Sequence, residues 1–322
     1  MTANQTNNRT TQRILYATPD IPHPSGGVKV LYRHAELLSR IGYDAHVMHF
    51  SPGFRCDWFE HNASIVTVDD LRQTDMVIVP ETMPDFAEEL AGRGIRYCIF
   101  VQNGYYVLPS QPDIARLCAC YRKATAIISI SEDTTDMLQS LMPDCADKIV
   151  RVRFPVYSDR FSPDDKENIV TFMPRKCELH AKNVVPWLRM QHPEWHFQPL
   201  MDMSEAEVAA QLRRSRIFLA FSDFEGGPLP PIEAAMSGNL VVGYHGWGGR
   251  EYWWEPNFME VPVGDVRCFV DRFDEACRYL NQELAMQTLE PGIAYLRHRY
   301  GEAEVSGTLQ ECAEILALYP SN

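Results

Sequence analysis

Short apolar segments alternate with segments of helical periodicity along nearly the whole chain. In the first repeat, the buried strand expected at 13–18 is followed by a Pro- and Gly-rich loop at 19–27. A helix with apolar residues on one face comes next, and then a strand at 45–50. This order requires parallel strands joined by right-handed crossovers, so the pattern predicts an α/β fold.

The pattern occurs in two series, separated by the polar, turn-rich segment 155–168. Further strands are expected at 76–79, 96–101, 126–130, 148–154, 169–173, 195–198, 217–221, 240–243 and 259–261. Further helices are expected at 83–92, from Ser131 onward, between the strands of the second series, at 266–282 and at 302–318. The sequence therefore predicts two Rossmann-like domains that face each other across a cleft. The expected parts are a disordered tail (1–11), an acceptor-side domain (12–157), a nucleotide-sugar-binding domain (158–301) and a terminal helix (302–322) that could cross back to the first domain.

Composition limits the class of protein. The 322 residues are enough for two domains, and 45% hydrophobic and 23% charged content is ordinary for a soluble globular chain. A net charge of −13 argues against a dedicated nucleic-acid binder. Nine cysteines without a C-x-x-C pair, no signal-like N-terminus and no long apolar run indicate a reduced, cytoplasmic protein. Histidines and cysteines never combine at zinc-ligand spacing, so no metal site is expected.

Two acids eight positions apart, Glu225 and Glu233, stand on either side of a Gly/Pro-rich turn. An apolar strand precedes the turn, and a short helix of small residues, expected to start near Glu233, follows it. Unpaired backbone N–H groups at such a turn favour an anionic ligand. The acids themselves are suited to accept hydrogen bonds from sugar or ribose hydroxyls.

The segment 222–242, SDFEGGPLPPIEAAMSGNLVV, resembles the pattern S-x-x-E-G-F-G-L-P-x-x-E-A-M-A-x-G-x-P-V-V of the family 4 retaining glycosyltransferases. With the glycine loop after the first strand, the resemblance covers nearly the whole chain. It implies the GT-B fold and transfer of a sugar with retention of configuration. It also implies a UDP- or GDP-sugar donor, no permanently bound cofactor and no required metal.

The resemblance assigns the catalytic roles to Glu225, Arg175 and Lys176. Arg175 and a lysine would neutralise the departing diphosphate, and Glu225 would contact hydroxyls of the donor sugar. Lys176 is favoured for the lysine, with Lys182 as the alternative. Pro228 departs from the pattern because it has no N–H to donate inside the turn.

Glu233 is the expected ribose-binding carboxylate. The other donor-binding candidates are Gly226, Gly227, Gly26, Gly27, Lys182 and His245. On the acceptor side, Asn103 and Tyr105 lie in a loop at the carboxyl end of a strand, where open α/β sheets bind ligands. Lys29 and Arg33 on the first helix could meet an anionic acceptor, but the favoured interpretation is that they are exposed charges.

The predicted function is a hexosyltransferase-like enzyme that transfers a sugar from a nucleotide-sugar donor to a hydroxyl of a glycan, a lipid-linked molecule or a small molecule. Glycosylation of modified DNA is an alternative that the acidic balance disfavours. A non-catalytic nucleotide-sugar-binding protein is another alternative. Peripheral membrane contact stays open, although no strongly basic amphipathic helix is evident.

Overall fold

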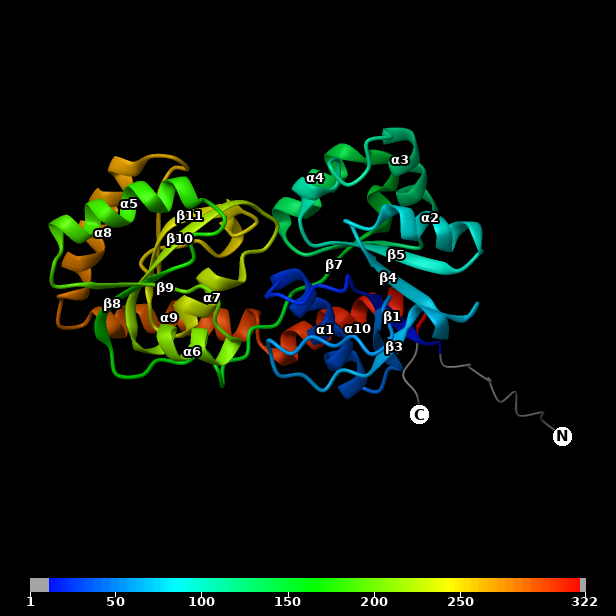
Figure 1. The fold of residues 1–322 in the computed structure, drawn as a ribbon, viewed down its shortest axis with the longest axis horizontal. Coiled ribbons are helices and arrows are strands. Elements are labelled where there is room, and N and C mark those ends of the chain that lie inside the picture. The colour runs from blue at the N-terminus through cyan, green and yellow to red at the C-terminus, as the bar shows by residue number, and fades with distance from the viewer. Residues whose placement is uncertain (1–11, 319–322) are drawn as a thin grey trace.

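The computed structural model describes residues 12–318. The tail at 1–11, for which disorder is predicted, lies outside the described residues. Figure 1 shows two lobes side by side, each built around one sheet with helices packed on its faces. All strand pairs in both sheets are parallel. The predicted α/β architecture of two Rossmann-like domains is therefore confirmed.

The first domain has a seven-stranded sheet in the order β3-β2-β1-β4-β5-β6-β7. Its strands are β1 (Ile14–Ala17), β2 (Ala45–His49), β3 (Ile65–Thr67), β4 (Met76–Pro80), β5 (Arg96–Val101), β6 (Ile127–Ser129) and β7 (Ile149–Arg151). Its helices are α1 (Gly26–Arg40), α2 (Pro84–Gly92), α3 (Ile114–Lys123) and α4 (Glu132–Leu141), with 3₁₀ turns at Val68–Asp70, Gly104–Tyr106 and Pro143–Lys148.

The second domain has a five-stranded sheet in the order β12-β11-β10-β8-β9. Its strands are β8 (Glu167–Phe172), β9 (His196–Pro199), β10 (Ser215–Glu225), β11 (Leu240–Trp247) and β12 (Phe258–Glu260). Its helices are α5 (Glu178–Gln191), α6 (Glu205–Arg214), α7 (Leu229–Met236), α8 (Val266–Leu280) and α9 (Ala285–Arg299), with a 3₁₀ turn at Arg250–Tyr252. The last helix, α10 (Glu302–Ile315), packs beside α1 on the first domain (Figure 1).

Three elements were not expected from the sequence. Strand β3 has only three residues, Ile65–Thr67, and is too short to stand out as a strand pattern in the sequence. Helix α9 contains Pro291, and a proline inside a helical pattern usually predicts that the helix ends or kinks there. Helix α3 buries Leu117, Cys120 and Tyr121 at helical spacing, a short pattern that was not recognised in the sequence.

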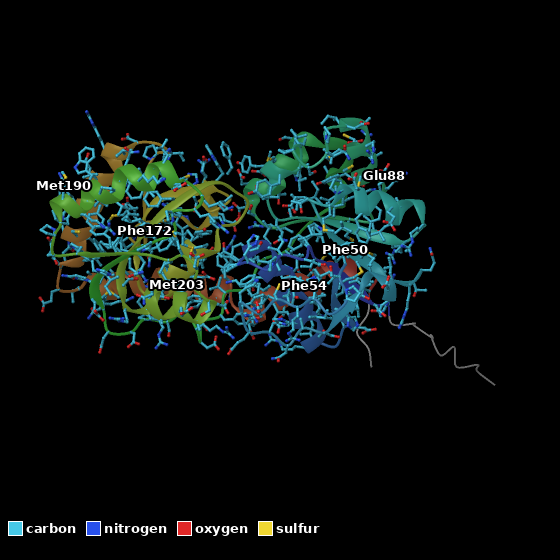
Figure 2. All side chains as sticks on the ribbon, viewed as in Figure 1. Phe50, Phe54, Glu88, Phe172, Met190 and Met203 are labelled. Atoms are coloured by element: carbon cyan, nitrogen blue, oxygen red, sulfur yellow. The ribbon has the colours of Figure 1, made fainter. Side chains whose placement is uncertain are left out.

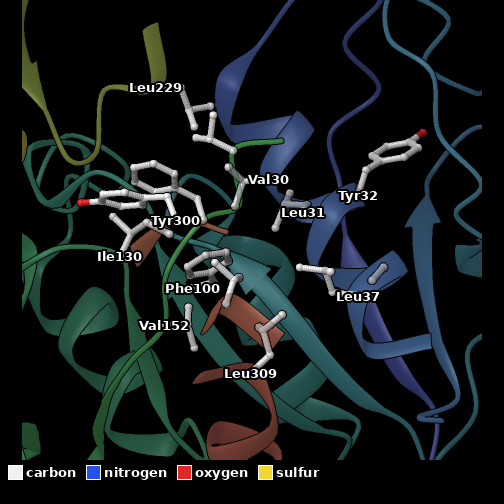
Figure 3. Close-up of a cluster of buried hydrophobic side chains, with 14 of the residues drawn as sticks. Val30, Leu31, Tyr32, Leu37, Phe100, Ile130, Val152, Leu229, Tyr300 and Leu309 are labelled. Atoms are coloured by element: carbon white, nitrogen blue, oxygen red, sulfur yellow. The ribbon is translucent and has the colours of Figure 1, made fainter. Parts of the chain in front are cut away.

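One apolar core runs through both domains. Alternate residues of a strand face opposite sides of its sheet, so Ile14 and Tyr16 of β1 belong to this shared core while Leu15 packs in a separate cluster. Figure 3 shows Leu229 of the second domain above Val30 of α1 in the shared core. The far face of the second sheet has its own cluster, which includes Phe172 (Figure 2).

The chain passes between the domains twice, and the two passages touch. The Val156 N–H donates to the carbonyl of Tyr300 at 2.8 Å. The ring of Phe154 stacks on the ring of Tyr300 with a centroid distance of 5.0 Å. The two connections are thereby held together by a hydrogen bond and an aromatic contact.

Candidate active site

A cleft of about 500 Å³ lies between the two domains. Its lining includes the loops that follow β1 and β4 in the first domain and β8 and β10 in the second. The two strands of each pair are neighbours in their sheet. From one of them the next strands are added on one side of the pair, and from the other they are added on the opposite side. Ligands of open α/β sheets bind at the carboxyl ends of strands at such points. The cleft therefore joins the two positions where this topology favours binding.

Glu225 stands at the carboxyl end of β10, whose register with β11 shifts between Ser222 and Glu225. Phe224, just before it, has φ 48°. The Glu225 carboxylate lies 2.9 Å from the ammonium of Lys176, which follows β8. Burial lowers the pKa of Lys176, but the attraction of Glu225 outweighs it and the pKa is raised overall. Lys176 is therefore held in its charged form beside the acid.

Arg175 points across the cleft toward the start of α1. Its guanidinium lies 3.4 Å from the carbonyl of Pro24. Helix α1 begins with Gly26 and Gly27, has no acid in its first turn, and receives no side-chain hydrogen bond from its N-cap residue Ser25. The first backbone N–H groups of α1 are thus left for a ligand, and a cation stands close to them.

Glu233 lies in the second turn of α7 and not at its start. The helix begins at Leu229, because Pro230 and Pro231 fit the first turn, where backbone N–H groups have no helical partner. The expected helix start at Glu233 was wrong for this reason. The Glu233 residue is 4% exposed, and its carboxylate lies 2.7 Å from the ammonium of Lys29.

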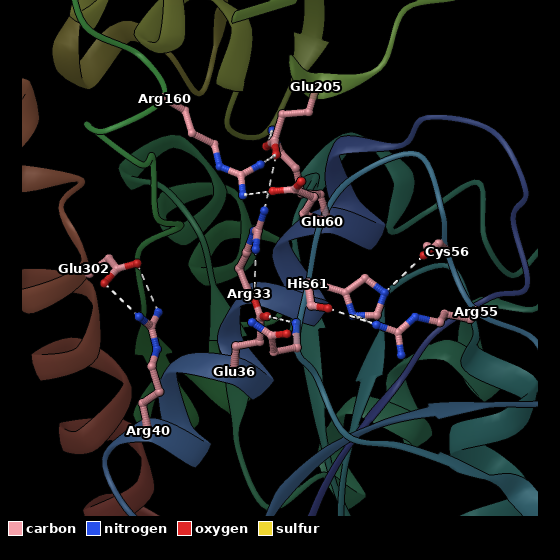
Figure 4. A network of polar contacts seen from close by, with 12 residues as sticks. Arg33, Glu36, Arg40, Arg55, Cys56, Glu60, His61, Arg160, Glu205 and Glu302 are labelled. Atoms are coloured by element: carbon pink, nitrogen blue, oxygen red, sulfur yellow. Dashed lines mark hydrogen bonds and ion pairs between the residues drawn. The ribbon is translucent and has the colours of Figure 1, made fainter. Parts of the chain in front are cut away.

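A buried charge network surrounds this pair. Lys29 also contacts Glu205 of α6 at 3.2 Å, and Arg33 and Arg160 contact the same carboxylate (Figure 4). Burial lowers the pKa of Lys29, but Glu233 and Glu205 raise it overall. The Lys29 side chain is 13% exposed and Arg33 is buried, so their interpretation as exposed charges was wrong. The contact comes from the other domain, which the sequence of α1 cannot reveal.

A further acid, Glu81, lines the cleft directly after β4. One carboxylate oxygen accepts from the N–H of Gln102 at 3.2 Å, and the other accepts from the N–H of Asn103 at 3.0 Å. Burial raises the pKa of Glu81 to about 7, against the effect of these hydrogen bonds. Sequence reasoning missed Glu81, although its place after a strand is the same signal that selected Asn103.

Asn103 lines the cleft and joins the domains. Its amide donates to the carbonyl of Phe224 at 2.7 Å, and its side-chain oxygen accepts from the N–H of Tyr105 at 3.0 Å. The Tyr105 hydroxyl donates to Asp133 at 3.0 Å, and Tyr105 does not line the cleft. Tyr105 therefore supports the loop from behind.

The two glycines of the β10–α7 turn allow close contact between the domains. A Cβ at Gly226 would lie 2.1 Å from the carbonyl oxygen of Gln102. A Cβ at Gly227, which lines the cleft, would lie 2.7 Å from the ring of Phe154. Both positions require glycine because a neighbouring residue occupies the space of a side chain.

Three of the expected donor-binding residues, Gly226, Lys182 and His245, lie outside the cleft lining. The Lys182 side chain is 67% exposed and pairs with Glu178 one turn earlier on α5, at 2.7 Å. His245 accepts from the N–H of Trp247 at 2.9 Å, and its other ring nitrogen lies 3.4 Å from Glu260. Burial lowers the pKa of His245 despite the attraction of Glu260. The cleft itself brings together Glu225, Arg175, Lys176, Glu233, Gly227, Gly26, Gly27 and Asn103.

Within residues 12–318, no group of three or more His, Cys, Asp or Glu side chains is arranged to hold a metal ion. In the same residues, no helix combines the length and the apolar character needed to cross a bilayer.

No protein-family model matches the sequence, and a search of curated proteins finds no match. Solved structures do match. A glycosyltransferase from Rickettsia africae shares 14% identity over 95% of this chain and 99% of its own, with a TM-score of 0.70. Sucrose-phosphate synthase from Thermosynechococcus elongatus shares 12% over 95% and 99%, with a TM-score of 0.72. The chain has the GT-B fold.

Anabaena HepE, solved in complex with UDP and glucose, has the same GT-B arrangement, with 11% identity over 96% of this chain and 100% of its own and a TM-score of 0.71. Identities this low establish the fold alone. The GT-B part of the resemblance is confirmed, and membership of family 4 stays a prediction.

Proposed function

We propose that this protein is a glycosyltransferase that uses a nucleotide-sugar donor. The observation that carries the proposal is the convergence, in one interdomain cleft, of two carboxylates and two cations on the second domain with the glycine-bearing start of α1 on the first. Structures of the same fold include one in complex with UDP-glucose and one with UDP and glucose, which supports this ligand class.

In this proposal the donor nucleotide binds to the second domain. The Glu233 carboxylate accepts hydrogen bonds from the ribose hydroxyls, since only one of its oxygens is taken by Lys29. The diphosphate lies between Arg175, Lys176 and the free N–H groups of α1. Positive groups placed there stabilise the charge that develops as the sugar leaves.

Glu225 is proposed to contact hydroxyls of the donor sugar, because it stands next to the diphosphate cation Lys176. The acceptor hydroxyl attacks the anomeric carbon from the face that the diphosphate leaves, so the configuration is retained. The bond between the anomeric carbon and the diphosphate oxygen breaks as the new glycosidic bond forms. An oxygen of the leaving diphosphate takes the proton of the acceptor hydroxyl.

The cations of the protein replace a divalent metal in this scheme. Transfer is therefore expected to proceed unchanged in excess EDTA. Loss of transfer in EDTA, with recovery on addition of Mg²⁺ or Mn²⁺, would contradict this part of the proposal.

The proposal is tested by thermal-shift screening with UDP, GDP and ADP, followed by donor hydrolysis and transfer assays with the sugars of any nucleotide that binds. We expect one nucleotide to stabilise the protein, and Glu225→Ala to lower the transfer rate by about a hundredfold. Failure of every nucleotide to bind would refute the proposal. Binding without donor turnover would instead indicate a non-catalytic nucleotide-sugar-binding protein.

A further inference from the structure

Helix α1 carries a lysine that reaches across the cleft to the second domain. The Lys29 ammonium lies 2.7 Å from the carboxylate of Glu233 on α7 and 3.2 Å from the carboxylate of Glu205 on α6. All three residues line the cleft, and helices α6 and α7 pack against each other. One cation of the first domain therefore lies between two acids of the second.

The second domain does not itself fix the carboxylate of Glu233. Within residues 12–318, the Lys29 ammonium is the only group that donates a hydrogen bond to this carboxylate, and it uses one of the two oxygens. The residue is buried, so bulk water is not at hand to replace the lysine. The orientation of the Glu233 carboxylate therefore depends on a residue of the other domain.

The lysine is held in place by the other acid. Glu205 is buried, and its carboxylate also pairs with Arg33 at 3.3 Å and with Arg160 (Figure 4). Burial lowers the pKa of Lys29, but the two acids raise it overall, so the ammonium stays charged. A charged lysine is thus anchored on Glu205 while it holds Glu233.

We propose that Lys29 is a positioning residue for the donor ribose, because it holds one oxygen of Glu233 and leaves the other oxygen as the acceptor for the ribose hydroxyls. This inference rests on the proposed function, since the lysine acts through the proposed ribose-binding carboxylate. A carboxylate oxygen has two lone pairs, which matches the two hydroxyls of a ribose. Lys29 itself contacts no atom of the donor in this arrangement.

A carboxylate that is fixed before binding makes stronger use of its hydrogen bonds to a ligand. A freely rotating side chain loses conformational freedom when the ligand binds, whereas a carboxylate already held by an ion pair loses little. The first domain thereby contributes to nucleotide affinity, although the nucleotide is proposed to bind to the second domain.

The test compares the nucleoside diphosphate that stabilises the protein with its 2′,3′-dideoxy analogue, which lacks both ribose hydroxyls. Calorimetric titration of the full chain gives the Kd of each ligand, and the wild type should bind the analogue at least about tenfold more weakly. The ratio of the two Kd values isolates the hydroxyls, because a change of charge near the diphosphate affects both ligands alike. We expect Lys29→Met to lower this ratio by about tenfold.

A thermodynamic cycle checks that the lysine acts through the acid. Glu233→Ala should lower the ratio as much as Lys29→Met does, and the double variant should show no further decrease. A further decrease in the double variant would contradict the inference. Lys29→Gln removes the charge and keeps a polar side chain, so it gives the same test, with a lower ratio expected, if Lys29→Met does not fold.

Lys123→Met is the matched control, because it removes the same charge from an exposed side chain at the end of α3, outside the cleft lining, and should leave the ratio unchanged. An unchanged ratio in Lys29→Met, even with both Kd values raised, would show that the lysine only joins the domains and would overturn the inference. A higher ratio would show that the lysine competes with the ribose, and would overturn it too.

The wild type separates this inference from the proposed function. If the wild type binds no nucleotide, or does not favour the ribonucleotide over its dideoxy analogue, the result counts against the proposed function and its ribose site. If the wild type favours the ribonucleotide and Lys29→Met does so equally, only the positioning role of Lys29 is lost.

Discussion

Two lysines six positions apart lie in opposite environments. Lys176 lies in the cleft against Glu225, whereas Lys182 is exposed on α5. In the proposed complex only Lys176 reaches the diphosphate. Lys176→Ala is therefore expected to raise the Kd of the nucleoside diphosphate by about tenfold or more, the effect of one charge-assisted hydrogen bond.

Lys182→Ala serves as the control for this prediction, since it removes the same charge outside the cleft. Calorimetric titration with the diphosphate measures both variants. If Lys182→Ala weakens binding and Lys176→Ala does not, the assignment of the diphosphate lysine is wrong.

Glu81 makes the stability of the protein depend on pH. Its pKa is raised by burial from 4.5 to about 7, so the folded chain holds this proton more tightly than the unfolded chain. The contribution to stability is fully present below about pH 4.5 and is lost as the pH rises to about 7. The buried hydroxyl of Tyr121 is the titratable group beside it. The free energy of unfolding is expected to fall by about 3 kcal/mol as this contribution is lost.

Urea unfolding at pH 5 and pH 8 tests this contribution. Glu81→Gln stays neutral at both values, so the wild type should lose more stability between them than the variant does. An equal loss in both proteins would show that Glu81 does not titrate in this range.

At the scale of elements, the turn between β10 and α7 is the most constrained connection of the cleft. Gly226 has no room for a Cβ, because the backbone of Gln102 fills that space. Gly226→Ala is expected to lower the free energy of unfolding by roughly 1–3 kcal/mol or more. The midpoint of thermal unfolding measures the effect.

Gly92 offers the matched control, since it ends α2 and a Cβ there would meet nothing within 4 Å. Gly92→Ala should be neutral or slightly stabilising. Equal midpoints for the two alanine variants would contradict the close contact at Gly226.

Elements with strong local signals could be predicted from the sequence. Strand β10, the glycine turn and the small-residue helix α7 were expected because a strand, a turn and a helix leave separate local patterns. The burial of Lys29 could not be predicted, since it depends on acids of the other domain more than 170 positions away. Pairings between domains leave no periodicity in either segment.

At the scale of the whole molecule, Glu251 ties the two domains together. Its carboxylate lies 2.6 Å from Arg151 of the first domain, accepts from the Tyr300 hydroxyl at 3.0 Å, and lies 3.5 Å from Arg299. The Glu251 side chain is 4% exposed. Glu251→Ala would leave both arginines without this partner and should destabilise the protein by about 3 kcal/mol.

Chemical denaturation measures this effect, with Glu89→Ala as the control. Glu89 forms an exposed pair with Arg93 within α2, so its loss should cost less than about 1 kcal/mol. Comparable losses for the two variants would show that the buried ion pair does not hold the domains.

The contact between Val156 and Tyr300 has a mechanical consequence. Two connections held side by side act as one hinge, because a rotation that separates them would break their hydrogen bond and unstack Phe154. A rotation of the domains that keeps both contacts would move the two connections together as one hinge. Such a rotation would have to break the ion pair between Lys29 and Glu233, which closes the cleft between the domains.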